Sequence, residues 1–198
     1  MINKKIAVLD LETTGFNAYD NEITEIGVIL LDGKTGEEVG SFGTLLKIKA
    51  DTIPEKITQL TGITKELTEQ YGMVLEVAGA YLKELLKDAV VVAHNVVFDF
   101  EFLKVHFDID PKYFWDTLSI SRGINQELRV HKLEVLCEEY GISLDNAHRA
   151  SDDARATSKL LVEMFKERPD ATKGYINKIS LGKYGIKYKP THTQEVLP

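Results

Sequence analysis

The stretch IAVLDLETTGF, residues 6–16, sets an apolar run directly before two carboxylates and a Thr-Thr-Gly turn. The apolar run predicts a buried strand. Side chains two apart on a strand point to the same side, so Asp10 and Glu12 should project together from the strand's end. In sheet folds ligands bind at strand ends, and a set of oxygen ligands selects a hard cation such as magnesium or manganese. Since 31 of the 198 residues are acidic, a lone pair of this kind also arises by chance.

The rest of the chain predicts an α/β fold. Strand-like runs at 4–10, 22–32 and 37–49, separated by glycine-containing turns, indicate an antiparallel meander. The run AVVVAH at 89–94 is continuously apolar and β-branched, which predicts a central parallel strand covered on both faces. Helical patterns occupy residues 52–62, 74–87, 98–107, 131–141 and 151–167. We therefore expect a mixed sheet, meander plus parallel strands, with helices on both faces.

Two details of the helices are also predicted. Thr52 and Glu55 are spaced as a capping box for the first helix, and Gly62 is placed to end it. The second helix carries an apolar stripe that we assign to the core: Val74, Leu75, Ala78, Tyr81, Leu82, Leu85 and Leu86.

Length, apolar runs and cysteine content limit the class of protein to which the chain can belong. A chain of 198 residues can bury one core, and no apolar run approaches the roughly 20 residues that span a bilayer. Cys137 is the only cysteine, which excludes an internal disulfide and a cysteine-based zinc site and suits a reducing compartment. With no secretory signal at the N-terminus, we expect a cytoplasmic protein with no membrane partner.

The net charge of −7 hides a division of the chain into two parts. Residues 169–198 hold five lysines against Asp170 and Glu195, a balance of +3 that leaves −10 for the remainder. We expect a domain over 1–168 and a basic tail over 169–198. Tyr175, Tyr184 and Tyr188 alternate with lysines there, a composition that can bind nucleic acid or form an edge hairpin.

Two further segments place acids at predicted helix starts. Asp99 follows the AVVVAH strand, where it can cap the next helix or join the first two acids; His94 and Asn95 are expected to hold the intervening turn by hydrogen bonds. His148 and Asp153 are five residues apart, so they converge only if His148 lies in the loop before the helix. Taken separately, each segment also fits an ordinary helix start or a surface histidine.

In their order and intervals, these pieces resemble the DEDDh exonuclease family. DLETTG at 10–15, HNVVFDFEFL at 94–103 and HRASDDA at 148–154 are similar to its three motifs, and LTGIT at 60–64 and WDTL at 115–118 also match. The resemblance covers roughly residues 4–166. It is closest to the proofreading epsilon subunit of bacterial DNA polymerase III and to the exonuclease domain of Gram-positive replicative polymerases. It implies a ribonuclease-H-like fold.

The resemblance also implies a mechanism. Asp10, Glu12, Asp99 and Asp153 would hold two ions of magnesium or manganese around the scissile phosphate, with His148 as general base. Nucleoside 5′-monophosphates would leave from the 3′ end of single-stranded DNA. Thr13 would contact the terminal nucleotide, and Leu11, Leu60 and Phe98 would pack or stack on its base.

Several alternatives stay open. RNA is a possible substrate, because ribonuclease T and oligoribonuclease share these residues, and a non-catalytic polymerase-associated module would have the same fold. A haloacid-dehalogenase-type phosphatase needs an aspartate where Glu12 stands. The expected protein partner is a DNA polymerase subunit or a sliding clamp; QEVL at 194–197 resembles part of a clamp-binding peptide without its aromatic residue.

Overall fold

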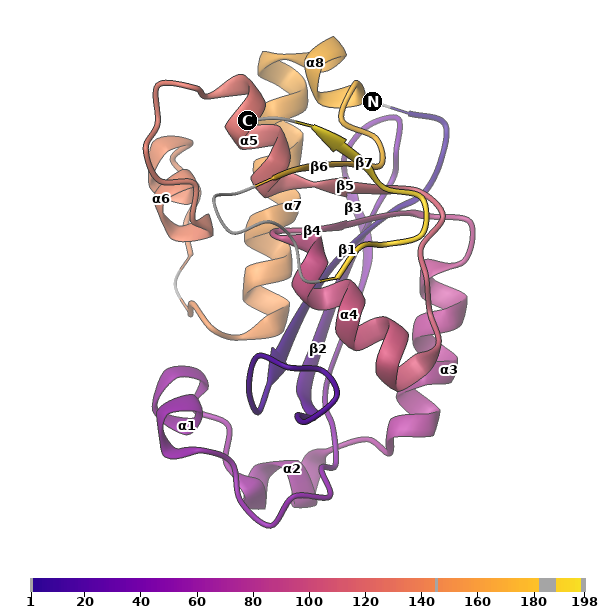
Figure 1. Ribbon diagram of the computed structural model, residues 1–198, viewed down its shortest axis with the longest axis vertical. Coiled ribbons are helices and arrows are strands. Elements are labelled where there is room, and N and C mark those ends of the chain that lie inside the picture. Colours follow the sequence, from indigo (N-terminus) through magenta and orange to yellow (C-terminus); the bar gives the residue numbers. More distant parts are fainter. Residues whose placement is uncertain (1, 145, 182–187, 197–198) are drawn as a thin grey trace.

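A five-stranded mixed sheet forms the centre of the computed structural model, which describes residues 2–144, 146–181 and 188–196 (Figure 1). Its strand order is β3-β2-β1-β4-β5, and β6 and β7 form a separate two-stranded sheet. The strands are β1 Ile6–Thr13, β2 Ile23–Leu31, β3 Glu38–Leu45, β4 Val90–Ala93, β5 Phe114–Asp116, β6 Lys178–Ser180 and β7 Gln194–Val196. β1, β2 and β3 pair antiparallel, whereas β4 runs parallel to both β1 and β5, as predicted.

The described part of the chain contains eight helices. They are α1 Glu55–Thr61, α2 Lys65–Tyr71, α3 Leu75–Leu86, α4 Val96–Phe107, α5 Thr117–Ile124, α6 Leu133–Glu139, α7 Ala150–Glu167 and α8 Pro169–Lys173. Within those same residues, none of the helices combines the length and apolar character that a membrane crossing needs.

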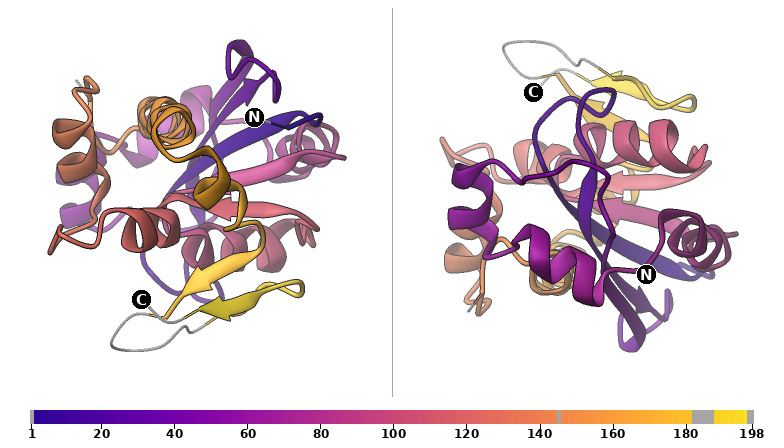
Figure 2. Two further views of the ribbon diagram at one scale, coloured as in Figure 1. Left: turned by 90° about the horizontal axis from the view of Figure 1, so that it is seen from above. Right: turned by 90° about the horizontal axis from the view of Figure 1, so that it is seen from below.

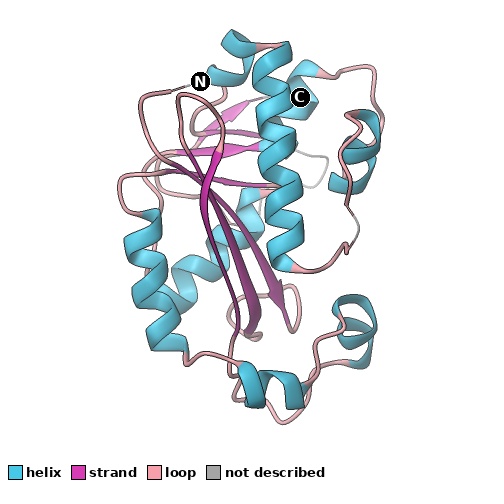
Figure 3. Cartoon of the chain, turned by 180° about the vertical axis from the view of Figure 1, so that it is seen from behind, coloured by secondary structure: helices cyan, strands magenta, loops and turns pink. Residues whose placement is uncertain are grey.

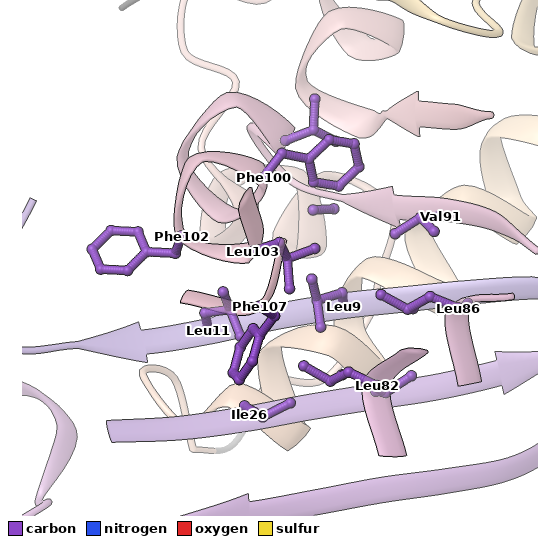
Figure 4. Packing of buried hydrophobic residues seen from close by; sticks show 14 of the residues in the cluster. Leu9, Leu11, Ile26, Leu82, Leu86, Val91, Phe100, Phe102, Leu103 and Phe107 are labelled. Atoms are coloured by element: carbon purple, nitrogen blue, oxygen red, sulfur yellow. The ribbon is translucent and has the colours of Figure 1, made fainter. Parts of the chain in front are cut away.

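Alternation along β1 divides the core into two layers. Ala7, Leu9 and Leu11 face α3 and α4 in a cluster whose packing is drawn in Figure 4. Ile6 and Val8 face the opposite way, into a cluster with residues of α5, α6 and α7. Figure 2 shows the sheet lying between these two groups of helices, and Figure 3 shows α7 running across one face. The predicted coverage of both sheet faces is therefore correct.

Two local predictions about the helices were wrong. The capping box of Thr52 and Glu55 does not form, because α1 begins after Pro54, although Gly62 does end the helix with φ 71°. On α3, Tyr81 is 53% exposed and Val74 lies at the N-cap and is exposed, whereas Ala78, Leu82 and Leu86 are buried. Tyr81 instead stacks on Phe42 of β3, with ring centroids 5.6 Å apart.

The described part of the tail is built onto the free edge of β5. Asn177 bonds that strand through its backbone and its side chain: its N–H donates to the Phe114 carbonyl (2.9 Å), and its Oδ1 accepts from the Phe114 N–H (2.8 Å). Its Nδ2 donates to the Lys112 carbonyl (2.9 Å). β6 and β7 pair in parallel, so these strands do not form the edge hairpin considered above.

Two of the three tail tyrosines lie in the part of the chain that the structure describes. Tyr175 and Tyr188 are partly buried against the two core layers, which reduces the ring surface open to a nucleobase. Burial also raises the pKa of the Tyr188 hydroxyl to about 12. Tyr184 lies outside the described residues. These contacts favour a structural role for the described part of the tail.

Asn177→Ala should lower the free energy of unfolding by about 1–3 kcal/mol, because it removes two hydrogen bonds at the sheet edge and leaves alanine at φ 54°. Thermal unfolding measures the loss as a fall of several degrees in Tm. Gln194→Ala, at an exposed position on β7, is the control and should change Tm by about a degree at most. Equal Tm values for the two variants would contradict the edge-closing role of Asn177.

Candidate active site

The site lies at the C-terminal end of β1, where this strand extends beyond its parallel neighbour β4. β4 pairs with β1 only over Ile6–Val8, so residues 9–13 continue past the end of their parallel neighbour. On the face where Ile6 and Val8 pack against α7, the next two side chains of the same phase are Asp10 and Glu12. The alternation predicted from the sequence therefore puts both carboxylates on one side, beyond the apolar layer.

Asp99 reaches the site by bonding the strand backbone that β4 leaves open. The Leu11 N–H donates to Asp99 Oδ1 (3.1 Å), across 88 residues of sequence. Asp99 lies in the first turn of α4, next to Asn95, whose φ of 78° turns the chain sharply from β4 into the helix. Asp99 is only 3% exposed and lines the same cavity as Asp10 and Glu12, so it is not a surface cap.

Asp116 at the end of β5 holds the turn after β4. Its Oδ1 accepts from the Asn95 N–H (2.8 Å), and its Oδ2 accepts from the Ser119 N–H (3.2 Å) at the start of α5. His94 lies in this turn as well: Nδ1 is 2.9 Å from Thr117 Oγ1, and Nε2 is 2.9 Å from the His131 carbonyl. The expectation that hydrogen bonds of His94 and Asn95 hold this turn is confirmed for the His94 side chain, whereas Asn95 contributes its backbone N–H; the partners of both come from elsewhere in the chain.

His148 lies in the loop before α7, as its spacing from Asp153 required. Its φ is 68°, and its backbone N–H donates to Asp153 Oδ2 (2.9 Å). This bond bends the chain back over the first turn of the helix. It brings the His148 ring and the Asp153 carboxylate to the same point despite their separation around a regular helix.

The four carboxylates and the histidine line one open cavity of about 680 Å³. Ligand atoms of Glu12, His148 and Asp153 lie within 4.8 Å of one another, an arrangement that can hold a metal ion. Asp10 and Asp99 line the same cavity beside them. Oxygen and imidazole ligands suit a divalent cation, so the donor set fits the metal that the sequence implied.

Burial and repulsion between neighbouring carboxylates raise the pKa values of the four acids. Desolvation, followed by the Asp153 and Glu25 carboxylates, raises the pKa of Glu12 to about 8. Desolvation likewise raises the pKa of Asp153 to about 6. Burial and neighbouring acids also raise the pKa of Asp10, chiefly through Asp99 among the acids, and burial raises that of Asp99. A divalent cation would relieve this repulsion.

The predicted substrate-binding residues fall into two groups. Leu11 and Phe98 line the cavity, and the Phe98 ring lies 6.4 Å from that of Phe16, which is 81% exposed. Thr13 is buried and its hydroxyl donates to the Gly15 carbonyl (2.6 Å), so that side chain is engaged within its own turn. Leu60, on α1, is 52% exposed and is absent from the cavity lining over the described residues.

Sequence reasoning missed several residues around the site. Asp116 belongs to the WDTL segment, and its place between a strand and a helix start is the signal that could have assigned it a capping role. The cavity lining also includes three cationic residues, Arg122, Arg129 and Lys132, a local charge that the net value of −7 conceals.

With this geometry established, comparison with known proteins assigns the family. A family model for exonucleases, RNase_T, matches residues 7–161. The chain belongs to this exonuclease family. The match confirms the sequence resemblance to the DnaQ-like, or DEDDh, exonucleases. The four predicted acids and His148 all lie within the matched residues.

Individual members of the exonuclease family show how this chain compares in length. DNA polymerase III PolC-type of Clostridium perfringens is 36% identical over 193 residues, which are 93% of this chain and 13% of that protein. The 3′–5′ exonuclease DinG of Staphylococcus haemolyticus is 37% identical over 166 residues, or 81% of this chain and 18% of that protein. The chain thus spans less than a fifth of each of these relatives.

Solved structures of exonuclease I share the fold. The Escherichia coli enzyme in complex with a dA16 oligonucleotide superimposes with a TM-score of 0.77 at 21% identity, over 86% of this chain and 42% of that chain. The zinc-bound form of its complex with single-stranded DNA gives the same TM-score. The expected ribonuclease-H-like fold is confirmed by this likeness.

Glu12→Gln should change how the metal-free protein responds to pH. Because folding raises the Glu12 pKa from 4.5 to about 8, the linked stability is fully present below pH 4.5 and is lost as pH rises towards 8. In EDTA, the Tm of Glu12→Gln minus that of wild type should therefore increase between pH 5 and 8. We expect an increase of several degrees, or about 1–3 kcal/mol. Parallel Tm profiles would place Glu12 outside the repulsive cluster.

Proposed function

We propose that the chain is a metal-dependent 3′–5′ exonuclease domain that removes nucleoside 5′-monophosphates from the 3′ end of single-stranded DNA. The observation that carries this proposal is the convergence of Asp10, Glu12, Asp99, Asp153 and His148 on one cavity. The DinG relative, named a 3′–5′ exonuclease, supports the direction of attack.

The acids and the histidine divide the chemistry between them. Asp10, Glu12, Asp99 and Asp153 would hold two ions of magnesium or manganese, which when bound stabilise charge on the attacking and leaving oxygens. His148 accepts the proton of the attacking water, whose oxygen joins the phosphorus as the bond to the 3′ oxygen breaks. Asp153, through its bond to the His148 N–H (2.9 Å), keeps the histidine loop at the reacting end of the cavity.

The walls of the cavity would bind the DNA strand. Arg122, Arg129 and Lys132 are suited to the phosphates that precede the scissile bond. Leu11 and Phe98 are suited to the terminal base, by packing and by stacking respectively. Thr13 would contact the terminal nucleotide through the turn that its hydroxyl bond to Gly15 holds. Leu60 lies outside the cavity lining, so it would contact the substrate only if the DNA strand passes beside α1.

We further propose that a DNA polymerase is the partner and that the activity is proofreading in the cytoplasm. The PolC-type relatives support the first part, and the lone buried Cys137 suits a reducing compartment. A sliding clamp is less well supported, because Gln194–Val196 pair with β6 and would have to leave that pairing to serve as an extended peptide. Leu197 lies outside the described residues.

The direct test is digestion of three 5′-labelled substrates: single-stranded DNA, duplex DNA and RNA. Each is assayed with magnesium, with manganese and with EDTA. We expect stepwise shortening from the 3′ end, fastest on single-stranded DNA, and none in EDTA. Faster loss of RNA would favour the ribonuclease T and oligoribonuclease alternative. Tight binding without shortening under every condition would favour a non-catalytic module.

Each of the four substitutions Asp10→Ala, Glu12→Ala, Asp99→Ala and Asp153→Ala should lower kcat by roughly a thousandfold or more, because the acids act as one unit. Pairs of these substitutions should lose little further activity. Initial rates on the oligonucleotide measure the effect, with Glu38→Ala on β3 as the control. Near-normal rates in any folded single variant would remove that residue from the set.

A further inference from the structure

One buried carboxylate beside the site is not among the proposed metal ligands. Glu25, on β2, is 4% exposed and is paired across the sheet with Glu12. Its Oε1 accepts from Arg149 Nη2 (2.8 Å), and its Oε2 accepts from Arg149 Nε (3.1 Å) and from the Ala150 N–H (3.0 Å). Arg149 directly follows His148 and is the N-cap residue of α7.

The start of α7 lies unusually close to the sheet at the same place. A Cβ on Gly27 would come within 2.2 Å of the Ala150 carbonyl oxygen. A Cβ on Gly43, the partner of Gly27 across β2 and β3, would come within 2.4 Å of Ser151 Oγ. Glycine at both positions lets the helix start rest on the strands, and Glu25, two residues before Gly27 on β2, bonds the same helix start.

We propose that Glu25 is a positioning residue that fixes the His148 loop against the sheet through Arg149 and Ala150, and this inference rests on the proposed exonuclease function. Asp153 bonds the loop to its own helix, whereas Glu25 bonds it to the strand that flanks Asp10 and Glu12. The two contacts together hold His148 in its φ 68° conformation beside Glu12 of β1.

The choice of residues supports this role over simple stabilisation. The Glu25 side chain is 5% exposed and that of Arg149 is 48% exposed, so the carboxylate loses most of its hydration on pairing. This loss offsets part of the attraction, and an ion pair with a buried member is often no more stabilising than an apolar contact of similar size. A fifth carboxylate near four others is an added electrostatic cost, and the two-pronged contact with Arg149 offsets it. Unlike an apolar contact, the pair fixes an orientation. The planar guanidinium bonds both carboxylate oxygens at once, which restricts how the His148 loop can lie against β2.

The same helix and sheet offer a matched control. Arg155, later on α7, pairs with Glu38 of β3 at 3.2 Å, and both side chains are more exposed than Glu25. This pair also joins α7 to the sheet but lies away from the cavity lining. It separates a general loss of helix docking from a loss of His148 placement.

Glu25→Ala and Arg149→Ala should each lower kcat on single-stranded DNA by about 10- to 100-fold, since small displacements of a reacting group cost rates of this order. KM should stay within about twofold. Glu38→Ala and Arg155→Ala should leave kcat within about twofold. Glu25→Gln keeps an oxygen for the Ala150 N–H and should therefore have a kcat between those of Glu25→Ala and wild type. The double variant Glu25→Ala, Arg149→Ala should have the same kcat as Glu25→Ala alone, because both substitutions remove the same contact.

Hydrogen exchange supplies a readout that does not need activity. The His148 and Ala150 amides should exchange at least several-fold faster in Glu25→Ala than in Glu38→Ala, because their loop is released. If Glu25→Ala does not fold, Glu25→Gln and Arg149→Lys are measured in its place, and both should show intermediate kcat values and exchange rates.

The outcomes separate this inference from the proposed function. Wild-type protein that digests no nucleic acid would overturn the exonuclease proposal, and the exchange comparison would still decide whether Glu25 holds the loop. A lower Tm with kcat and exchange equal to those of Glu38→Ala would make Glu25 a structural residue only. A rise in KM without a fall in kcat would make Arg149 a substrate contact and would also overturn the positioning role.

Discussion

Alternation of side chains along β1 is the constraint on which the site and the core both depend. Ile6 and Val8 anchor the strand in the layer beneath α7, and the same phase then delivers Asp10 and Glu12 to the cavity. The opposite phase, Ala7, Leu9 and Leu11, stays in the layer of α3 and α4. A shift of one residue in the pairing of β1 would turn the acids into the apolar layer of α3 and α4 and turn Leu9 and Leu11 towards the cavity. The apolar layers therefore fix where the charges lie.

Electrostatic repulsion is the main cost of this arrangement, and the chain distributes the compensation over distant segments. Asp99 accepts the Leu11 N–H, Asp153 accepts the His148 N–H, and Glu25 accepts Arg149. Each bond holds one carboxylate in place while leaving others to interact with a cation. Two residues beside these contacts, Asn95 and His148, have positive φ, and asparagine and histidine are among the types that tolerate it best.

Much of this could be predicted from the sequence because it depends on short-range patterns. The period of two placed Asp10 and Glu12, the apolar AVVVAH run identified β4, and the five-residue spacing required His148 to precede its helix. The same logic misassigned Tyr81, whose helical phase suits a core position but whose ring stacks on Phe42 at the surface. Asp99 was ambiguous by itself, since a surface acid at a helix start and a buried acid that lines a cavity look alike in one segment.

The contacts that sequence patterns could not reveal join residues far apart in the chain. Glu25 and Arg149 are separated by 124 residues, and Asn177 meets Phe114 across 63. Each of these residues has an ordinary local explanation, as a strand acid, a surface arginine or a turn asparagine. Only the three-dimensional arrangement shows that the first pair adjoins the cavity and the second closes the sheet.

The shortness of β4 has a consequence for redesigning such a protein. If β4 continued beside residues 9–13, its carbonyl groups could take the Leu11 N–H that Asp99 now accepts, and the sheet would become more regular. Asp99 would then lose its anchor, and the turn at Asn95 would move away from the carboxylates. A redesign that lengthens strands to idealise the architecture would thus increase regularity by erasing the opening in which chemistry can occur. In this fold, an incomplete sheet is a requirement of the site.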